Sequence, residues 1–558
     1  MNRPTPLQKR IDAALGKTPC DVIIRGARYL DVFSCQWREG DVAVMDGVIA
    51  AVDPGLKGRR EINGDGRWLV PGFIDAHVHI ESSMLTPAEF EAAVLPRGTT
   101  TAVCDPHELA NVMGMEGLRY FLSAAEQANL DLRVMLSSCV PATTMETNGA
   151  GAISAAQLAS LASHPQALGL AEMMNVPGVL GGDPGIHAKL EAFQHTNIDG
   201  HCPLLRGREL SAYASTGISS CHESSELEEA REKLSKGISV WIREGSVAKD
   251  LNALVPLLTL ATSTSVGFCT DDRNPLDIDT EGHIDFLIRG AIAAGVAPEV
   301  AYRASSWSVA RHYGLRRLGA IAPGYRADLV LLDDPRTCAV NTVFKSGGPG
   351  GERQPPRRVS TNATNTVRAS VPEAAAFQGP SGRVHVIGVR HGRILTDRHV
   401  LDHDAPGVAR LTVLERHGMG SPPANAYVTG FGAGLRGAIA SSVGHDSHNL
   451  IVVGSNIQDM RTALAALIQS GGGFSVVRDG AAKALLPLPF GGLMSLKSHG
   501  DIAKELRTLK AAARGIGCEL PEPFLQLAFL SLPVIPTLKL TDKGLVDVDL
   551  FRVIDVRA

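Results

Sequence analysis

Two histidines separated by one residue, His77 and His79, close a run of apolar residues near the start of the chain. Successive side chains of a β-strand alternate between its faces, so on a strand these two imidazoles point the same way. Two imidazoles in that arrangement can bind one metal ion. The alternative is a pair of structural histidines, because the motif is short and common.

Further residues of metal-ligating type end other strand-like segments. They are Glu172, His201, His222 and Asp271. Ionised carboxylates are seldom buried without partners, so core packing does not easily explain the set, and we predict a metal site. Six ligands are too many for one catalytic ion that keeps an open position, and they suit two ions bridged by a carboxylate.

Glu172 is the predicted bridge, because it is the lone carboxylate midway along the series of strands. The mixed nitrogen and oxygen ligands do not by themselves distinguish manganese, iron and zinc. We expect manganese or iron first, with zinc as the alternative.

The residues between 71 and 319 supply the elements that must position these ligands. Short apolar segments alternate there with helix-like stretches such as 116–128 and 225–237. The strand-like segments are 72–79, 99–107, 132–140, 167–175, 197–203, 217–224, 238–246 and 265–272. This rhythm predicts an α/β fold, a (β/α)₈ TIM barrel, over a doubly wound sheet, and active sites of such barrels lie at the C-terminal strand ends.

Other regions flank the predicted barrel. Residues 1–70 and 320–345 share short β-branched runs and could pair into one small β-domain. Residues 346–380 are rich in Gly, Pro, Ser and Thr, which indicates a linker or mobile loop. Residues 381–558 contain both strand-like and helix-like segments, so we expect a C-terminal α+β domain.

The overall composition of the 558 residues excludes several classes of protein. A net charge of −4 gives no basic surface for nucleic acid or an anionic membrane, and no apolar run has the length of a membrane span. The start of the chain lacks the apolar core of a secretion signal. Nine cysteines without a C-x-x-C pair predict a reducing compartment, the cytoplasm.

Several residues near the strand ends are secondary candidates. His107 and Glu108 follow the second strand and could contact a substrate or orient a water, and otherwise form a helix-capping loop. Glu244 ends the seventh strand and could bind a substrate N–H, or pair structurally with Arg243. Asp272 points away from Asp271 on a strand, which favours a structural role.

A cluster near the C-terminus has the pattern H-D-x-H. Its members are His445, Asp446 and His448. They could cover the active site or bind another ion, and polar loop contacts are the preferred interpretation.

Longer motifs carry a family resemblance. PGFIDAHVHIESS (71–83) resembles the first-strand signature of the amidohydrolase superfamily, and GAIAPGYRADLVLLDD (319–334) resembles its exit into a flanking β-sandwich. Five further strings are similar to bacterial adenine deaminases: CDPHELANV (104–112), AEMMNVPGV (171–179), WIREGS (241–246), CTDDR (269–273) and ASSVGHDSHNLIVVG (440–454). The resemblance covers nearly the whole chain, and only the stretch 345–380 is longer than expected.

The resemblance implies hydrolysis of adenine to hypoxanthine and ammonia, a step of purine salvage, by a hydroxide bridging two metals. Asp271 would serve as a metal ligand and as the base that passes a proton to the departing amine. Single-metal deaminases carry H-x-x-E at the fifth strand, but here Cys202, Pro203 and Leu204 follow His201, which favours two metals. A cyclic amidohydrolase that opens hydantoin or dihydropyrimidine rings, and a non-catalytic scaffold, are the alternatives. We expect a homodimer or homotetramer.

Overall fold

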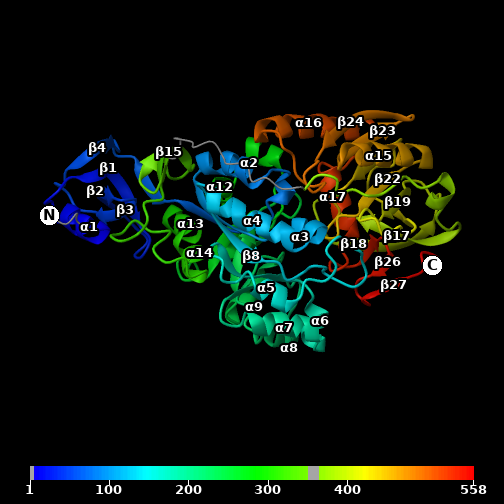
Figure 1. The fold of residues 1–558 in the computed structure, drawn as a ribbon, viewed down its shortest axis with the longest axis horizontal. Coiled ribbons are helices and arrows are strands. Elements are labelled where there is room, and N and C mark those ends of the chain that lie inside the picture. Colours follow the sequence, from blue (N-terminus) through cyan, green and yellow to red (C-terminus); the bar gives the residue numbers. More distant parts are fainter. Residues whose placement is uncertain (1–4, 350–362) are drawn as a thin grey trace.

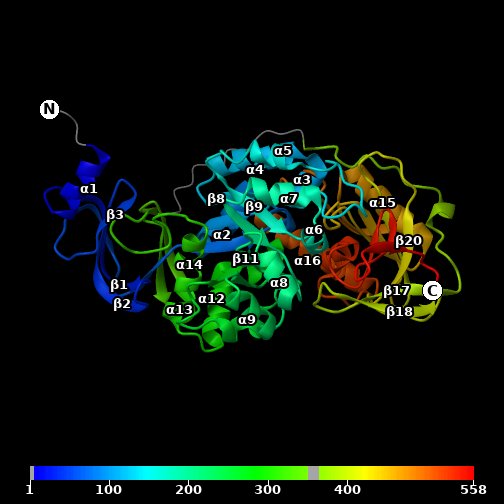
Figure 2. The same ribbon diagram turned by 90° about the horizontal axis from the view of Figure 1, so that it is seen from below.

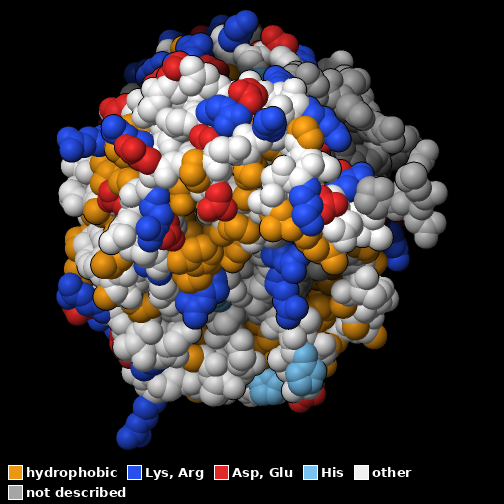
Figure 3. Space-filling view, turned by 90° about the vertical axis from the view of Figure 1, so that its left-hand side faces the viewer, with side chains coloured by type: hydrophobic (Ala, Val, Ile, Leu, Met, Phe, Trp, Pro, Cys, Tyr) orange, Lys and Arg blue, Asp and Glu red, His pale blue; other side chains and the backbone are white. Residues whose placement is uncertain are grey.

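The computed structural model describes residues 5–349 and 363–558 and is elongated. Figure 1 shows a small sheet at the N-terminal end, a central barrel, and a C-terminal region at the other end. Within the described residues, no helix combines the length and apolar character that crossing a bilayer requires. The end face around the first sheet mixes cationic, anionic and apolar side chains (Figure 3).

The central strands form one parallel sheet in the order in which they occur along the chain. They are β6 (Phe73–Val78), β7 (Thr99–Cys104), β8 (Asp131–Leu136), β9 (Ala167–Met173), β10 (Asn197–Gly200), β11 (Ser220–Cys221), β12 (Ser239–Arg243) and β13 (Val266–Cys269). A parallel bridge between Val78 and Asp271 joins the last strand to the first. That closure confirms the (β/α)₈ barrel and excludes the doubly wound sheet.

Helices surround these strands (Figure 2), so the strands are buried on both faces and consist mostly of apolar residues. The helices are α2 (Pro87–Val94), α3 (His107–Met113), α4 (Met115–Gln127), α5 (Ala155–Ala159), α6 (Val176–Gly181), α7 (Pro184–Ala192), α8 (Gly207–Ala214), α9 (Leu227–Ser235), α10 (Leu251–Leu254), α11 (Pro275–Thr280), α12 (Ile284–Ala293), α13 (Pro298–Ala304) and α14 (Trp307–His312). Each connection returns the chain to the end of the barrel where the strands begin, so the C-terminal strand ends lie together at the opposite end.

Two distant segments build the flanking sheet, because β5 pairs antiparallel with β14. Its elements are α1 (Pro6–Ala14), β1 (Cys20–Asp31), β2 (Gln36–Met45), β3 (Val48–Ala51), β4 (Gly58–Asn63), β5 (Trp68–Pro71), β14 (Leu329–Asp334), β15 (Ala339–Lys345) and β16 (Gly348–Pro349). The barrel is therefore an insertion between strands of one sheet, as the fold class predicts. The exact domain boundaries stay a prediction.

Part of the predicted linker 346–380, residues 350–362, lies outside the described residues. In the part that follows, Val367, Ala369 and Val371 pack against the C-terminal core. This described part therefore belongs to the surface of the C-terminal region.

The C-terminal region contains an eight-stranded sheet, a three-stranded sheet and three helices among its described residues. Its elements are β17 (Arg383–Val389), β18 (Thr396–Asp402), β19 (Ala409–Leu414), β20 (Ala424–Thr429), β21 (Ala438–Ser441), β22 (Leu450–Gly454), α15 (Ile457–Ser470), β23 (Gly473–Arg478), β24 (Ala481–Pro487), α16 (His499–Gly515), α17 (Pro523–Ala528), β25 (Leu538–Thr541), β26 (Gly544–Asp547) and β27 (Arg552–Ile554). Helix α15 shows how local sequence sets the bounds: Asn456 accepts a hydrogen bond from Asp459 N at its start, and Gly471 ends it in a left-handed conformation.

This region packs against the end of the barrel that carries the strand C-termini. Thr147 N donates to Asp542 Oδ1 at 2.9 Å, and Thr541 Oγ1 donates to Met145 O at 2.6 Å. The C-terminal region therefore covers the face where barrel active sites are built.

A buried ion pair on α9 gives a testable contribution to stability. Lys233 Nζ lies 2.7 Å from Glu229 Oε1, and both side chains are fully buried. Lys233→Met should reduce the free energy of unfolding by about 3–5 kcal/mol, because it leaves the glutamate charge buried without its cation. Urea unfolding would measure the loss.

Lys236→Met is the matched control on the same helix. Lys236 pairs with Glu232 at the same spacing and distance, 2.7 Å, but both side chains are about a quarter exposed. The control should lose less than about 1 kcal/mol. Equal losses in the two variants would contradict the role assigned to burial.

Candidate metal centre

The backbone of β6 and the turn after β13 bring the first ligands together. His77 lies in β6 and His79 directly after it, and both are buried. Asp271 N donates to His77 O at 3.0 Å, and His79 N donates to Asp271 O at 3.3 Å. The left-handed backbone of Asp271, with φ of 54°, turns its carboxylate toward both imidazoles.

One group of four ligand atoms converges there. His79 Nε2 lies 3.1 Å from His77 Nε2, 3.2 Å from Glu172 Oε1 and 3.2 Å from Asp271 Oδ1. His77 Nε2 lies 3.7 Å from each of those carboxylate oxygens. Atoms bound at about 2.1 Å to one tetrahedral ion lie about 3.4 Å apart, so the four positions suit a shared ion.

A second group uses the other oxygen of the same glutamate. Glu172 Oε2 lies 2.6 Å from His201 Nδ1 and 3.2 Å from His222 Nε2. The two oxygens of Glu172 thus face different sets of histidines. This is the arrangement expected of a carboxylate that bridges two ions.

An unsatisfied polar atom supports metal binding. Among the described residues, the buried His222 Nε2, which faces Glu172 Oε2, has no hydrogen-bond partner. Buried polar groups without partners are uncommon and need an explanation. Buried groups that combine two imidazoles with a carboxylate are suited to binding divalent first-row metal ions.

Arg243 neutralises part of the carboxylate charge beside this centre. Its Nη1 donates to Asp271 Oδ2 at 2.9 Å, and it also pairs with Glu223 and Asp250. Burial alone would raise the pKa of Asp271, but His79, His222 and Arg243 hold that pKa well below its usual value. Sequence reasoning missed Arg243 and Glu223 as site residues, although both occupy strand-end positions.

The structure does not bring Glu244 to the centre, contrary to the expectation for substrate binding. Its Oε2 accepts a hydrogen bond from Leu251 N at 3.0 Å, at the start of α10. Arg243 and Glu244 are neighbours, so their side chains point to opposite sides of the chain. Because Arg243 faces the ligands, Glu244 must face the helix.

Arg243→Met should lower kcat/KM or metal affinity by about 10- to 100-fold, because Arg243 orients and neutralises the carboxylate of Asp271, a predicted metal ligand. Steady-state kinetics and metal analysis would measure the change. The adjacent Glu244→Gln is the control and should change kcat/KM by less than about threefold, since that side chain caps a helix. A larger effect in Glu244→Gln would contradict this assignment.

His107 and Glu108 lie near the centre but in different surroundings. His107 Nδ1 is 2.9 Å from Asp105 Oδ2 and 3.3 Å from Glu172 Oε1, so its ring borders the ligands. Glu108 accepts a hydrogen bond from Ser82 Oγ at 2.6 Å and does not line the cavity beside the metal ligands. Ser82 also bonds Asp272, whose pKa is raised to about 6 by burial and by the charge of Asp271.

A small cavity opens above the ligands, and the C-terminal region forms one of its walls. His445 and Asp446 line it together with the apolar side chains of Ile394, Phe529 and Leu532. The H-D-x-H cluster therefore does more than make the loop contacts that were preferred from sequence. Its first two residues reach the site.

Lys539 holds two segments of this wall together. Its buried ammonium donates to Ile394 O at 2.8 Å and to Phe529 O at 3.0 Å, and burial lowers its pKa to about 7. The carbonyls it binds belong to two of the apolar residues that line the cavity. Lys539 is thus a positioning residue for the cavity wall.

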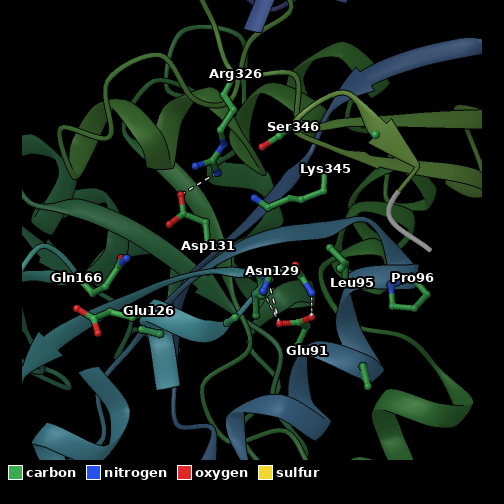
Figure 4. Close-up of a pocket in the computed structure, with 15 residues that line it drawn as sticks. Glu91, Leu95, Pro96, Glu126, Asn129, Asp131, Gln166, Arg326, Lys345 and Ser346 are labelled. Atoms are coloured by element: carbon green, nitrogen blue, oxygen red, sulfur yellow. Dashed lines mark hydrogen bonds and ion pairs between the residues drawn. The ribbon is translucent and has the colours of Figure 1, made fainter. Parts of the chain in front are cut away.

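A larger cavity, of about 530 Å³, lies at the opposite end of the barrel (Figure 4), near the starts of β8 and β9. Its charged groups already have partners: Arg326 Nη2 lies 2.7 Å from Asp131 Oδ2, and Glu91 Oε1 accepts from Asn129 Nδ2 at 2.9 Å. These pairs indicate a structural contact between the barrel and the flanking sheet. The candidate metal ligands lie at the other end of the barrel, at the C-terminal strand ends.

Comparisons with known proteins agree on a family. Residues 68–350 match the amidohydrolase family model, and residues 389–552 match the model of the adenine deaminase C-terminal domain. The chain is 50% identical to adenine deaminase of Cereibacter sphaeroides and 51% identical to that of Methylobacterium sp., in each case across 98% of this chain and 99% of the relative. Among solved structures, N-acetylglucosamine-6-phosphate deacetylase from Thermotoga maritima is similar at 17% identity and a TM-score of 0.44, covering 59% of this chain and 99% of that one.

Proposed function

The chain belongs to the amidohydrolase family, within its adenine deaminases, and we propose that its strand-end ligands perform the hydrolytic deamination of adenine at two metal ions. The products of that reaction are hypoxanthine and ammonia, and purine salvage is a consistent role. The observation that carries the two-ion proposal is Glu172, whose oxygens face separate histidine groups. His77, His79, Glu172 and Asp271 would hold one ion, and Glu172, His201 and His222 the other.

When bound, the ions supply a water whose pKa is lowered enough for it to act as a nucleophile near neutral pH. Glu172 and the histidines would hold these ions. Asp271 Oδ1 is directed at His77 and His79, whereas Oδ2 is held by Arg243 at 2.9 Å. An ionised Asp271 can take the proton of the attacking water and give it to the departing amine.

His107 is the second predicted catalytic residue. Its ring is held between Asp105 and Glu172 and lines the cavity, so it can contact the water or the purine. The apolar wall of Ile394, Phe529 and Leu532 supplies a surface for a planar, uncharged base. We propose manganese or iron as the native metal, with zinc as the alternative, since the ligand set does not choose.

Cellular setting and assembly are also proposals. All nine cysteines are free thiols, which supports a reducing compartment and hence the cytoplasm. A homodimer or homotetramer stays a prediction. No nucleic-acid or membrane partner is proposed.

Metal removal tests the function. Chelation should reduce adenine deamination by at least about 10³-fold, because metal catalysis contributes several kcal/mol to the barrier. Activity should return in proportion to added Mn²⁺ and reach its maximum once the two positions around Glu172 are filled. Full recovery with one ion would contradict the bridged arrangement.

The same preparation separates the alternatives. Ammonia release from adenine with no ring opening of hydantoin or dihydrouracil is the expected result. The cyclic amidohydrolase alternative would show the reverse preference. A scaffold protein would release no ammonia when loaded with metal.

A further inference from the structure

We propose that His107, His445 and Asp446 bind a third divalent metal ion where the barrel meets the C-terminal region. All three side chains are at least 97% inaccessible to solvent. They come from α3 and from the loop between β21 and β22. This proposal does not rest on the deaminase activity, and it assigns His107 Nε2 to the ion in place of a direct contact with the purine.

The spacing of the ligand atoms carries the argument. Asp446 Oδ1 lies 3.5 Å from His107 Nε2 and 3.5 Å from His445 Nδ1. Nitrogen–oxygen hydrogen bonds are about 2.7–3.2 Å long, so these contacts are too long to be good ones. They match the separation of about 3.4 Å between two ligands of one tetrahedral ion.

Two atoms of this cluster lack partners. Among the described residues, His107 Nε2 and the second oxygen of Asp446, Oδ2, make no hydrogen bond, while His445 Nδ1 also lies 3.8 Å from Glu108 Oε1. A buried carboxylate oxygen left without a donor costs about 1–3 kcal/mol or more. A cation bound between the three side chains would satisfy both atoms at once.

The residue behind His107 supports ligation through Nε2. Asp105 Oδ2 lies 2.9 Å from His107 Nδ1, and Asp105 Oδ1 accepts a hydrogen bond from Ser137 Oγ at 2.6 Å. Metal-binding histidines usually donate their other ring N–H to such a carboxylate, which fixes the tautomer and the ring plane. His445 is fixed as well, because its ring stacks on Phe529 at a centroid distance of 4.7 Å.

The third position is separate from the two metal groups described above. His107 turns Nδ1 toward Glu172 and Nε2, on the opposite edge of the ring, toward Asp446. Two imidazoles and one carboxylate suit zinc, iron or manganese. An ion there would connect α3 of the barrel to the 445–446 segment and so hold the C-terminal wall over the cavity.

Metal counting and anomalous diffraction test the proposal on the full chain. Wild-type protein reconstituted with Zn²⁺ and desalted should hold one more ion per chain than Asp446→Asn, by elemental analysis. Diffraction at the zinc edge should show a peak between His107, His445 and Asp446 that Asp446→Asn lacks. Ser447→Ala, a buried non-ligand on the same loop, should retain the wild-type count and peak.

Two results would overturn the proposal. Equal zinc content in wild type and Asp446→Asn, with no peak at this position in wild type, would show that no ion binds there. A higher KM for adenine in Asp446→Asn with an unchanged metal count would assign Asp446 to the purine instead. If Asp446→Asn folds poorly, His445→Gln and the wild-type diffraction peak decide.

Discussion

Glu172→Gln is expected to reduce kcat for adenine by about 10³-fold or more. The glutamine amide keeps the shape of the side chain but loses the charge and one of the two oxygens that face the histidine groups. Bridging two cations needs both oxygens of an anionic carboxylate. A loss of several kcal/mol of transition-state stabilisation at about 1.36 kcal/mol per factor of ten gives this magnitude.

Two measurements define the result. Elemental analysis of the purified variant should show fewer bound ions than wild type, and excess Mn²⁺ in the assay should restore only part of the activity. Circular dichroism should be unchanged, because the backbone of β9 is held by its neighbours β8 and β10. A variant with wild-type metal content and near-normal kcat would remove Glu172 from the bridge and with it the two-ion proposal.

Asp271→Asn should separate proton transfer from metal binding. We expect kcat to fall by about 10²- to 10⁴-fold, the usual contribution of a positioned general acid–base group. The amide can still contribute an oxygen ligand beside His77 and His79, so metal content should fall less than in Glu172→Gln. KM for adenine should change by less than about threefold if Asp271 acts on the reacting atoms rather than on binding.

Asp272→Asn is the matched control for this experiment. Asp272 is the next residue and its carboxylate bonds Ser82. Contrary to the expectation that it points away from Asp271, it also lines the cavity and groups with His79 and Asp271. The comparison therefore tests which of the two neighbouring aspartates transfers the proton. The control should retain kcat within about tenfold. If Asp272→Asn loses as much as Asp271→Asn, the proton-transfer role has been assigned to the wrong aspartate.

Much of the fold could be predicted from the sequence because it depends on local patterns of apolar and polar residues. Apolar runs alternating with amphipathic helices such as α4 predicted the barrel, and β13 lies within the predicted segment 265–272. The same patterns placed the ligand types at strand ends. The pairing of β5 with β14 was predicted only as a similarity of composition, because no local signal specifies which distant strands pair.

The secondary site residues were harder to predict from the sequence, for two physical reasons. On β12 the choice between Arg243 and Glu244 depends on strand register, and a shift of one residue reverses which side chain faces the site. His445 and Asp446 depend on a contact across a sequence separation of more than 300 residues, between α3 and the loop after β21. No periodicity or motif spacing reports such a contact.

The sequence by itself determined the kind of chemistry: six ligand-type residues at the ends of barrel strands, in an order typical of one family. The tertiary structure decided how these six residues form two groups, because only three-dimensional packing turns the two oxygens of Glu172 toward different histidines. It also decided that the C-terminal region helps to form the site, through His445 and Asp446. Residue types and strand ends are local properties of a chain, whereas the direction of each side chain and the contacts between distant regions depend on how all the elements pack.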